Sequence, residues 1–489
     1  MRAASFFWLA LGLDILIVSG VALIFQNRLF GHQRPAVIAA SMAAGSATAA
    51  PLQGENRVLR MLILADDLSG AADCGVACVC AGLSTVVALQ ETAGEVAADV
   101  LSLDADTRRM DPEAAAREVG RIVRNYASNQ NLFLYKKIDS TLRGNVAIEL
   151  AAALDAHRRA NPLKVRTIAV MAPAFPAIGR TTVNGIQLAH GQPIHDLDVW
   201  RHQNMTGRAH IPDMLANAGL KCALLQLDAI RSARSSLSDR MKLTATQADV
   251  LVCDAETDED LLAIASASME LERRPIWVGS AGLAYQLPHV AGIGSATGVE
   301  PVMMPASRGP LLFVIGSLSR NSVEQVRVLT SSSDTFELSV PPEVLLAPVD
   351  SPSLQEYAHQ LQNAICSNRD VVLSPAPEPR VDLDQRPLLA AALARLATSA
   401  GEGIGALISA GGETARAVLQ SWGVNRLRLL GELQRGIPVS VSENWSRQLP
   451  VITKAGDFGR SDALLECSQF LHNADPSLVS QHFIRKAIQ

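Results

Sequence analysis

Short apolar runs that end in a turn and continue into a helical pattern recur along this chain, and this alternation most limits its fold. The first run, 61–64, is followed by Asp66 and Asp67 and then by a small-residue helical stretch that begins near Ser69. Parallel strands need a crossover connection, which is usually a helix. The pattern therefore predicts an α/β fold with mainly parallel sheets flanked by helices.

The two adjacent carboxylates have two interpretations. In an open α/β sheet, ligands bind at the carboxyl ends of the strands, where Asp66 and Asp67 would lie. Acidic groups side by side in such a place are unfavourable unless they bind a metal, a sugar hydroxyl or a cation. Alternatively, Asp67 or Ser69 caps the following helix by accepting hydrogen bonds from its free backbone amides.

The most polar turn follows the apolar run 132–135 and reads KKIDSTLRGN, residues 136–145. Two cations beside an acid and two hydroxyls suit a carboxylate that carries several hydroxyl groups, because arginine binds it in bidentate geometry and lysine adds a point charge. A surface turn before a helix over 146–157 is the alternative. The stretch 172–185, with two prolines and two glycines, predicts a rigid loop that could add Arg180. The candidate residues in the turn are Lys137, Asp139, Ser140, Thr141, Arg143 and Asn145.

A second series of strand and turn patterns follows a Gly-, Ala- and Pro-rich stretch, 291–308, which predicts a linker. We therefore expect one domain over 61–290 and another over 309–489. Glycine turns at the starts of helices in the second domain could present backbone amides to phosphate. No GxxxxGK[ST] motif occurs, which argues against a P-loop enzyme. The candidate nucleotide-binding residues are Ser317, Ser319, Gly411, Gly412, Glu413, Thr414 and Gly456.

Residues 1–60 contain an apolar segment, 5–25, interrupted by Asp14, and then an Ala- and Ser-rich tether. The segment could anchor the chain in a membrane with the body in the cytoplasm, or translation could start at Met61 and leave the segment as an upstream artefact; a signal peptide is less favoured. Seven scattered cysteines favour reduced thiols and a cytoplasmic location. The formal net charge of −5 gives no general basic field for nucleic acid.

Eight motifs occur in order along the chain: ADDLSGAADCG, KKIDSTLRGN, APAFPAIGRTTVNG, VGSAGLA, GSLS, AGGETARAV, RGIPVS and KAGDFG. Together they resemble the four-carbon acid sugar kinase family, the kinases of threonate, erythronate and 3-oxo-tetronate. The resemblance extends from Met61 to the C-terminus, and KIDSTLRGN is more similar to the threonate branch. Ser69 stands where many relatives have Thr, Asp457 stands where the common form has Asn, and the residues before Met61 have no counterpart.

The resemblance implies that ATP, with Mg²⁺, phosphorylates the terminal (4-) hydroxyl of a four-carbon sugar acid, with D-threonate as the expected substrate and D-erythronate or 3-oxo-tetronate as alternatives. It implies an active site between a sugar-acid domain and a nucleotide domain. Asp66, Asp67 or Asp139 would orient or deprotonate the hydroxyl, and Lys137 and Arg143 would hold the carboxylate. The sequence identifies no metal ligands and leaves homodimer formation open.

Two alternatives of another class remain. The chain could be a sugar-acid binding protein that nucleotide only regulates, or a membrane-tethered partner protein. The second rests solely on residues 5–25.

Overall fold

The structure is a computed structural model that describes residues 58–91, 96–129, 131–161, 166–197, 200, 207–294, 304–377 and 385–473. The apolar segment 5–25, its tether and residues 295–303 of the expected linker lie outside these ranges. Among the residues described, no helix combines the length and the apolar character needed to cross a bilayer.

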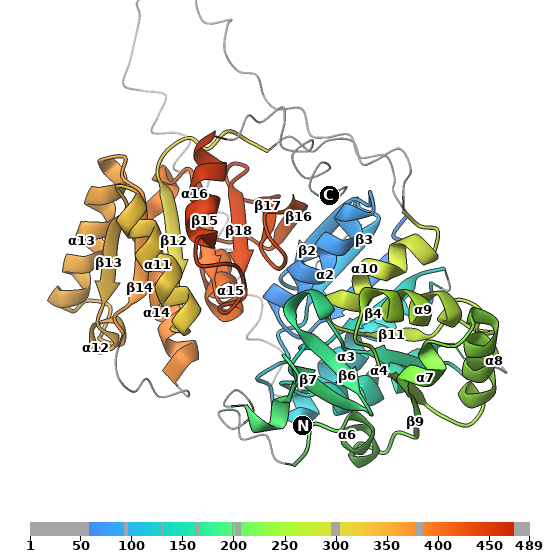
Figure 1. The fold of residues 1–489 in the computed structure, drawn as a ribbon. Coiled ribbons are helices and arrows are strands. Elements are labelled where there is room, and N and C mark those ends of the chain that lie inside the picture. The colour runs from blue at the N-terminus through green and yellow to red at the C-terminus, as the bar shows by residue number, and fades with distance from the viewer. Residues whose placement is uncertain are drawn as a thin grey trace, which may run out of the picture. The chain divides into compact units, whose positions relative to one another are not determined.

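In the N-terminal half, parallel strands in the order β2-β3-β1-β4-β11-β5-β10-β9 lie between two layers of helices (Figure 1). The strands are β1 (Met61–Ala65), β2 (Thr85–Ala88), β3 (Val100–Asp104), β4 (Phe133–Lys137), β5 (Ala169–Ala172), β9 (Cys222–Leu225), β10 (Val250–Cys253) and β11 (Ile276–Gly279). One face packs on α2 (Leu68–Cys80), α8 (Arg234–Ala245), α9 (Asp258–Ser268) and α10 (Ala281–Val290). The other face packs on α3 (Pro112–Tyr126), α4 (Val146–Ala160) and α6 (Ile211–Asn217). Both faces are thus buried, as parallel sheets require.

The C-terminal half continues the sheet in the order β13-β14-β12-β15-β18-β17-β16. Its strands are β12 (Leu311–Ile315), β13 (Phe336–Val340), β14 (Val371–Pro375), β15 (Ala406–Ala410), β16 (Arg426–Glu432), β17 (Pro438–Ser442) and β18 (Pro450–Lys454). The helices α13 (Pro352–Cys366), α14 (Arg386–Ala397) and α15 (Gly412–Ser421) bury their apolar residues in one core cluster. The helices α11 (Arg320–Ser332) and α16 (Ala463–Asn473) contribute to another.

The two halves share one sheet. Strand β16 pairs antiparallel with β2, with Leu427 opposite Val87, and this pairing makes a single sheet of 15 strands. The α/β class expected from the sequence is confirmed. Each half contributes a mainly parallel set of strands, and the edge strand of one half continues the ladder of the other.

The helices and strands agree closely with those predicted from the sequence, with one exception. Helix α3 begins after Asp111, whose side chain accepts a hydrogen bond from the amide of Ala114. The stretch 172–185 was expected to be a rigid loop, but its second part forms a β-hairpin of β6 (Arg180–Val183) and β7 (Ile186–Ala189). Asn184 and Gly185 both have positive φ angles, as a two-residue hairpin turn of type I′ requires.

Candidate functional site

Polar side chains gather where three neighbouring strands of the N-terminal half end. Strand β1 lies between β3 and β4 in register, so the residues that follow these strands meet at one edge of the sheet. Asp66 and Asp67 follow β1, Arg108 lies in the turn after β3, and Asp139 lies just after β4. The structure therefore brings together the three aspartates that the sequence suggested as catalytic candidates.

Arg108 links these carboxylates. Its Nε and Nη2 atoms donate to Asp66 at 2.7 and 3.0 Å, and its Nη1 atom donates to Asp67 at 2.6 Å. Its Nη2 atom also lies 3.6 Å from a carboxylate oxygen of Asp139. Burial alone would raise the pKa of Asp66, but Arg108 and Lys137 outweigh it and lower that pKa. Asp66 is therefore held as an anion.

Asp139 is held in the same way by a second arginine. The Nε and Nη2 atoms of Arg143 each donate to Asp139 at 2.7 Å. Burial opposes ionisation, but Arg143 and Arg108 hold the pKa of Asp139 well below its usual range. Thr141 adds a hydroxyl and an amide donor to the same carboxylate. The guanidinium of Arg143 thus already has an internal partner.

Asp67 fits both interpretations of the sequence at once. Its Oδ1 atom accepts a hydrogen bond from the amide of Gly70 at 2.9 Å, so it caps α2. Its Oδ2 atom accepts from Arg108, and its side chain is 18% exposed, against 4% for Asp66 and 8% for Asp139. Asp67 is thus the most accessible of the three aspartates.

Lys137 lies over the first turn of α2. A Cβ atom at Gly70 would collide with the Nζ atom of Lys137 and stand 2.7 Å from the Oδ1 atom of Asp67, so a larger residue here would displace one of these side chains. Burial would lower the pKa of Lys137, but Asp66 and Asp67 raise it, and the ammonium stays charged. The preceding Lys136 points to the opposite face of the sheet, where it pairs with Glu149 at 2.7 Å.

The remaining residues of the turn mainly fix its shape. The Nδ2 atom of Asn145 donates to the carbonyls of Thr107 and Met110 at 3.0 and 2.9 Å, which ties the turn after β3 to the turn after β4. The carbonyl of Ser140 accepts from the Nε2 atom of the buried Gln187 at 3.0 Å. Gln187 belongs to β7, so the hairpin supports the polar turn directly.

Arg180 begins the same hairpin and is half-buried. Burial lowers its pKa, whereas the carboxylates of Asp139 and Asp457 act in the opposite direction. Asp457 therefore lies within electrostatic range of a cation of the N-terminal half.

The predicted nucleotide residues also converge, at the ends of β12, β15 and β18, which are adjacent in the sheet. A Cβ atom at Gly411 would lie 3.6 Å from the Oγ1 atom of Thr414 and 3.8 Å from the amide nitrogen of Ser317. The hydroxyl of Ser319 caps α11 and donates to the carbonyl of Gly456 at 3.2 Å. Three turns that are distant in the sequence thus form one polar cluster.

Lys454, at the end of β18, belongs to this cluster. Its Nζ atom donates to the carbonyl of Gly456 at 2.9 Å. Burial lowers the pKa of Lys454 to about 8.

The first turn of α15 connects the two clusters. A Cβ atom at Gly412 would stand 3.0 Å from the Oδ2 atom of Asp67 and 2.8 Å from the Oγ atom of Ser69. Glu413 forms an ion pair with Arg109, which follows Arg108 in the chain. The predicted catalytic and nucleotide residues are therefore in direct contact here.

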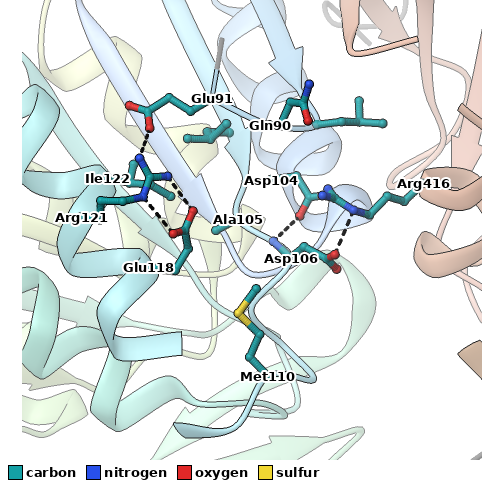
Figure 2. Close-up of a pocket in the computed structure, with 12 residues that line it drawn as sticks. Gln90, Glu91, Asp104, Ala105, Asp106, Met110, Glu118, Arg121, Ile122 and Arg416 are labelled. Carbon is teal, nitrogen blue, oxygen red and sulfur yellow. Dashed lines mark hydrogen bonds and ion pairs between the residues drawn. The ribbon is translucent and has the colours of Figure 1, made fainter. Parts of the chain in front are cut away.

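Further along α15, Arg416 pairs with Asp104 and, at 3.0 Å, with Asp106 (Figure 2). These three residues also line a pocket of about 560 Å³ that extends to Glu91 and Arg121 (Figure 2). The pocket includes none of the site residues predicted from the sequence, so it lies beside the cluster.

The sequence predictions omitted four residues that shape this region. Arg108 and Arg109 are adjacent cations in the turn after β3, and this position at a strand end could have marked them as candidate site residues. Gln187 and Arg416 carry no local signal, because their partners lie 47 and 312 residues away.

Two protein families match this chain. Residues 61–287 match the family described as sugar-binding N-terminal domain, and residues 312–464 match the nucleotide-binding C-terminal domain. A D-threonate kinase of Cupriavidus necator is 39% identical, over 82% of this chain and 96% of that protein. The chain belongs to the four-carbon acid sugar kinase family.

Other relatives in the family differ in the substrate that they are named for. A D-erythronate kinase of Heliobacterium modesticaldum is 27% identical, over 84% of this chain and 97% of its own length. A crystal structure of a Salmonella typhimurium protein has the same fold, with a TM-score of 0.69 and 20% identity over 84% of this chain and 99% of that chain.

Proposed function

We propose that this member of the family uses ATP to phosphorylate the 4-hydroxyl of a four-carbon sugar acid, with D-threonate as its substrate. The observation that carries the proposal is the contact between Asp67, in the sugar-binding half, and Gly412, in the first turn of α15. Phosphoryl transfer requires the hydroxyl and the γ-phosphate to meet in line. The carboxylate of Asp67 would hold the hydroxyl, and the turn at Gly412 would hold the phosphate beside it. The 39% identity to a D-threonate kinase supports the choice of substrate.

Asp67 is the best candidate for the residue that orients the hydroxyl and takes its proton. Asp66 and Asp139 are each held by two hydrogen bonds from one guanidinium and have lowered pKa values, which makes them weak bases. In the reaction, the hydroxyl oxygen bonds to the γ-phosphorus, while the bond from that phosphorus to the β–γ bridging oxygen breaks. The electron pair of that bond leaves with ADP, and the hydroxyl proton passes to Asp67.

The sugar-acid carboxylate needs cations at the other end of the substrate. Lys137 keeps a charged ammonium at the edge of the carboxylate cluster, and the half-buried Arg180 faces the same region. We assign these two residues to the substrate carboxylate, together with Arg143 and the hydroxyls of Ser140 and Thr141. Asn145 positions the turn, since its amide group binds two backbone carbonyls.

ATP would bind at the turns formed by Ser317, Ser319, Gly411, Gly412, Glu413, Thr414 and Gly456. Within the described ranges, no group of three or more His, Cys, Asp or Glu residues could hold a metal ion. Mg²⁺ would therefore take most of its ligands from phosphate oxygens and water, as is usual for this ion, with Glu413 as the nearest carboxylate in the turn. When bound, the metal would neutralise charge on the β- and γ-phosphates.

We also propose the division into a sugar-acid domain, 61–290, a linker, 291–308, and a nucleotide domain, 309–489, which the matched regions 61–287 and 312–464 support.

A need for ATP favours the cytoplasm as the site of action. Light scattering of the purified chain would test for a homodimer.

The test is ADP release by the purified full chain with ATP and Mg²⁺, measured with D-threonate, L-threonate, D-erythronate and 3-oxo-tetronate. We expect the highest kcat/KM with D-threonate and a product phosphorylated at the 4-position, as read by ³¹P NMR. Preference for another of these acids would overturn the substrate assignment. Binding of sugar acid and ATP without any ADP release would instead indicate a nucleotide-regulated binding protein.

A further inference from the structure

Arg109 extends from the sugar-binding half to the first turn of α15. Its neighbour Arg108 is fixed by Asp66 and Asp67, and the amide of Arg108 donates to the carbonyl of Asp66 at 3.2 Å. The next residue, Met110, is held through its carbonyl by Asn145. The backbone on both sides of Arg109 is therefore anchored at the proposed site, while its guanidinium pairs with Glu413.

Glu413 occupies a place that suits an anion. It is the second residue of α15 and follows Gly412, the glycine that touches Asp67. Free backbone amides and the helix dipole make the start of a helix favourable for negative charge. A carboxylate held there by an arginine has the partners that a phosphate group would have.

Another anion can replace Glu413 as the partner of Arg109 at little cost in stability. The side chains of Arg109 and Glu413 are 43% and 42% exposed. Exposed ion pairs contribute little to stability, so replacing the carboxylate by a ligand does not disturb the fold. A phosphate offers arginine two oxygens in bidentate geometry, which is a stronger interaction.

Other cations lie close to this pair. Arg386, the first residue of α14, lies within electrostatic range of Arg109, Arg143 and Glu413, and its pKa is lowered by burial and by the two neighbouring arginines. Arg143 is already paired with Asp139, so Arg109 and Arg386 are the cations that remain on this side for Glu413 or a phosphate.

We propose that Arg109 is a catalytic residue that exchanges Glu413 for the γ-phosphate of ATP and stabilises the charge on the phosphoryl group during its transfer. This inference rests on the proposed kinase function. The bonds that form and break are those described above, and Arg109 transfers no proton. It acts by charge and geometry alone, as arginines do in other phosphoryl-transfer enzymes.

The test compares Arg109→Ala and Arg109→Lys with the wild-type chain. We expect Arg109→Ala to lower kcat by about 100-fold or more. The Arg109→Lys variant should recover part of this loss, because it keeps the charge but not the bidentate geometry. The control is Arg117→Ala, which removes an exposed arginine of α3 that pairs only with Glu113 among the residues described.

A binding measurement separates contact with phosphate from a structural role. By calorimetry, Arg109→Ala should weaken binding of the β,γ-imido analogue of ATP about 10-fold or more while leaving ADP affinity within about twofold, because ADP lacks the γ-phosphate. If Arg109 only held the two halves together through Glu413, Glu413→Gln and Arg109→Ala would reduce kcat equally and both nucleotides would be affected alike. That result, or a kcat for Arg109→Ala within about threefold of wild type, would overturn the inference.

The wild-type assay keeps this test independent of the proposed function. If the wild-type chain releases no ADP with any of the four sugar acids, the kinase proposal itself fails. If the wild type is active but Arg109→Ala behaves like Arg117→Ala, only the role of Arg109 is wrong.

Discussion

Gly412 touches Asp67: a Cβ atom at this glycine would stand 3.0 Å from the Oδ2 atom of the carboxylate. The two residues are 345 positions apart in the sequence. Their contact brings the carboxyl end of β1 to the start of α15, so the acceptor hydroxyl and the donor phosphate would meet here.

Gly412→Ala should impair catalysis without unfolding the protein. The added methyl group would press on Asp67 and on the Oγ atom of Ser69, so either the carboxylate or the turn must shift. A displacement of about 1 Å at a reacting group can lower kcat by about 100-fold. Steady-state kinetics would measure the loss. The matched control is Gly120→Ala in α3, where the nearest atom to the new methyl group is 3.6 Å away and activity should be unchanged.

Asp67→Asn should separate capping from catalysis. Asparagine can still accept the hydrogen bond from the amide of Gly70, so α2 keeps its cap. The amide cannot take a proton from the hydroxyl, and we expect kcat to fall by about 10²–10⁴-fold while the affinity for ATP stays within about threefold. Turnover near the wild-type value would rule out Asp67 and return the role to Asp66 or Asp139.

Arg108→Gln should destabilise the fold most strongly at neutral pH. It leaves Asp66 and Asp67 without their main partner, and removing one member of a buried ion pair costs about 3–5 kcal/mol. The pKa values of Asp66 and Asp139 are lowered in the folded protein, so this stabilisation is present above about pH 4 and is lost as the pH falls through the folded values. Urea unfolding at pH 7 and at pH 2 should show the larger deficit at pH 7. Arg117→Gln, at an exposed site, should show none at either pH.

Asp73 should give the opposite pH dependence. This carboxyl lies in α2, its Oδ1 atom has no hydrogen-bond partner within the described part of the chain, and burial raises its pKa to about 7 despite the nearby Lys137. The folded state therefore holds a proton that the unfolded chain releases above about pH 4, and stability falls as the pH rises from about 4 to 7. We expect Asp73→Asn to be more stable than wild type at pH 8, by up to about 4 kcal/mol, and similar at pH 4.

Asp155→Asn, at an exposed residue of α4, is the control for Asp73→Asn and should not change this slope. Equal stability of Asp73→Asn and wild type at pH 8 would contradict the raised pKa.

The sequence predicted the elements whose signals are local. The apolar runs 61–64 and 132–135 identified strands β1 and β4. The Asp66–Asp67 pair and the KKIDSTLRGN turn lie at neighbouring strand ends, as the rule for parallel sheets led us to expect. Both the capping and the site interpretation of Asp67 were reasonable, because one side chain has both sets of contacts.

The features that the sequence did not predict depend on contacts that its local patterns do not specify. The two prolines and two glycines of 172–185 predicted a rigid loop, whereas Asn184 and Gly185 form the turn of the hairpin β6–β7. Arg143 was expected to hold the substrate carboxylate, and its guanidinium also donates two hydrogen bonds to Asp139, four residues before it in the chain. The continuity of the sheet could not be predicted either, since β2 and β16 are more than 300 residues apart.

The pairing of β16 with β2 has a consequence for how the molecule unfolds. A structural unit that shares backbone hydrogen bonds with its neighbour cannot lose its own strands without exposing the edge of the other. Heat or denaturant should therefore melt the sugar-acid and nucleotide regions in a single transition. Calorimetry of the intact chain would then record one peak, with the enthalpy of the whole sheet.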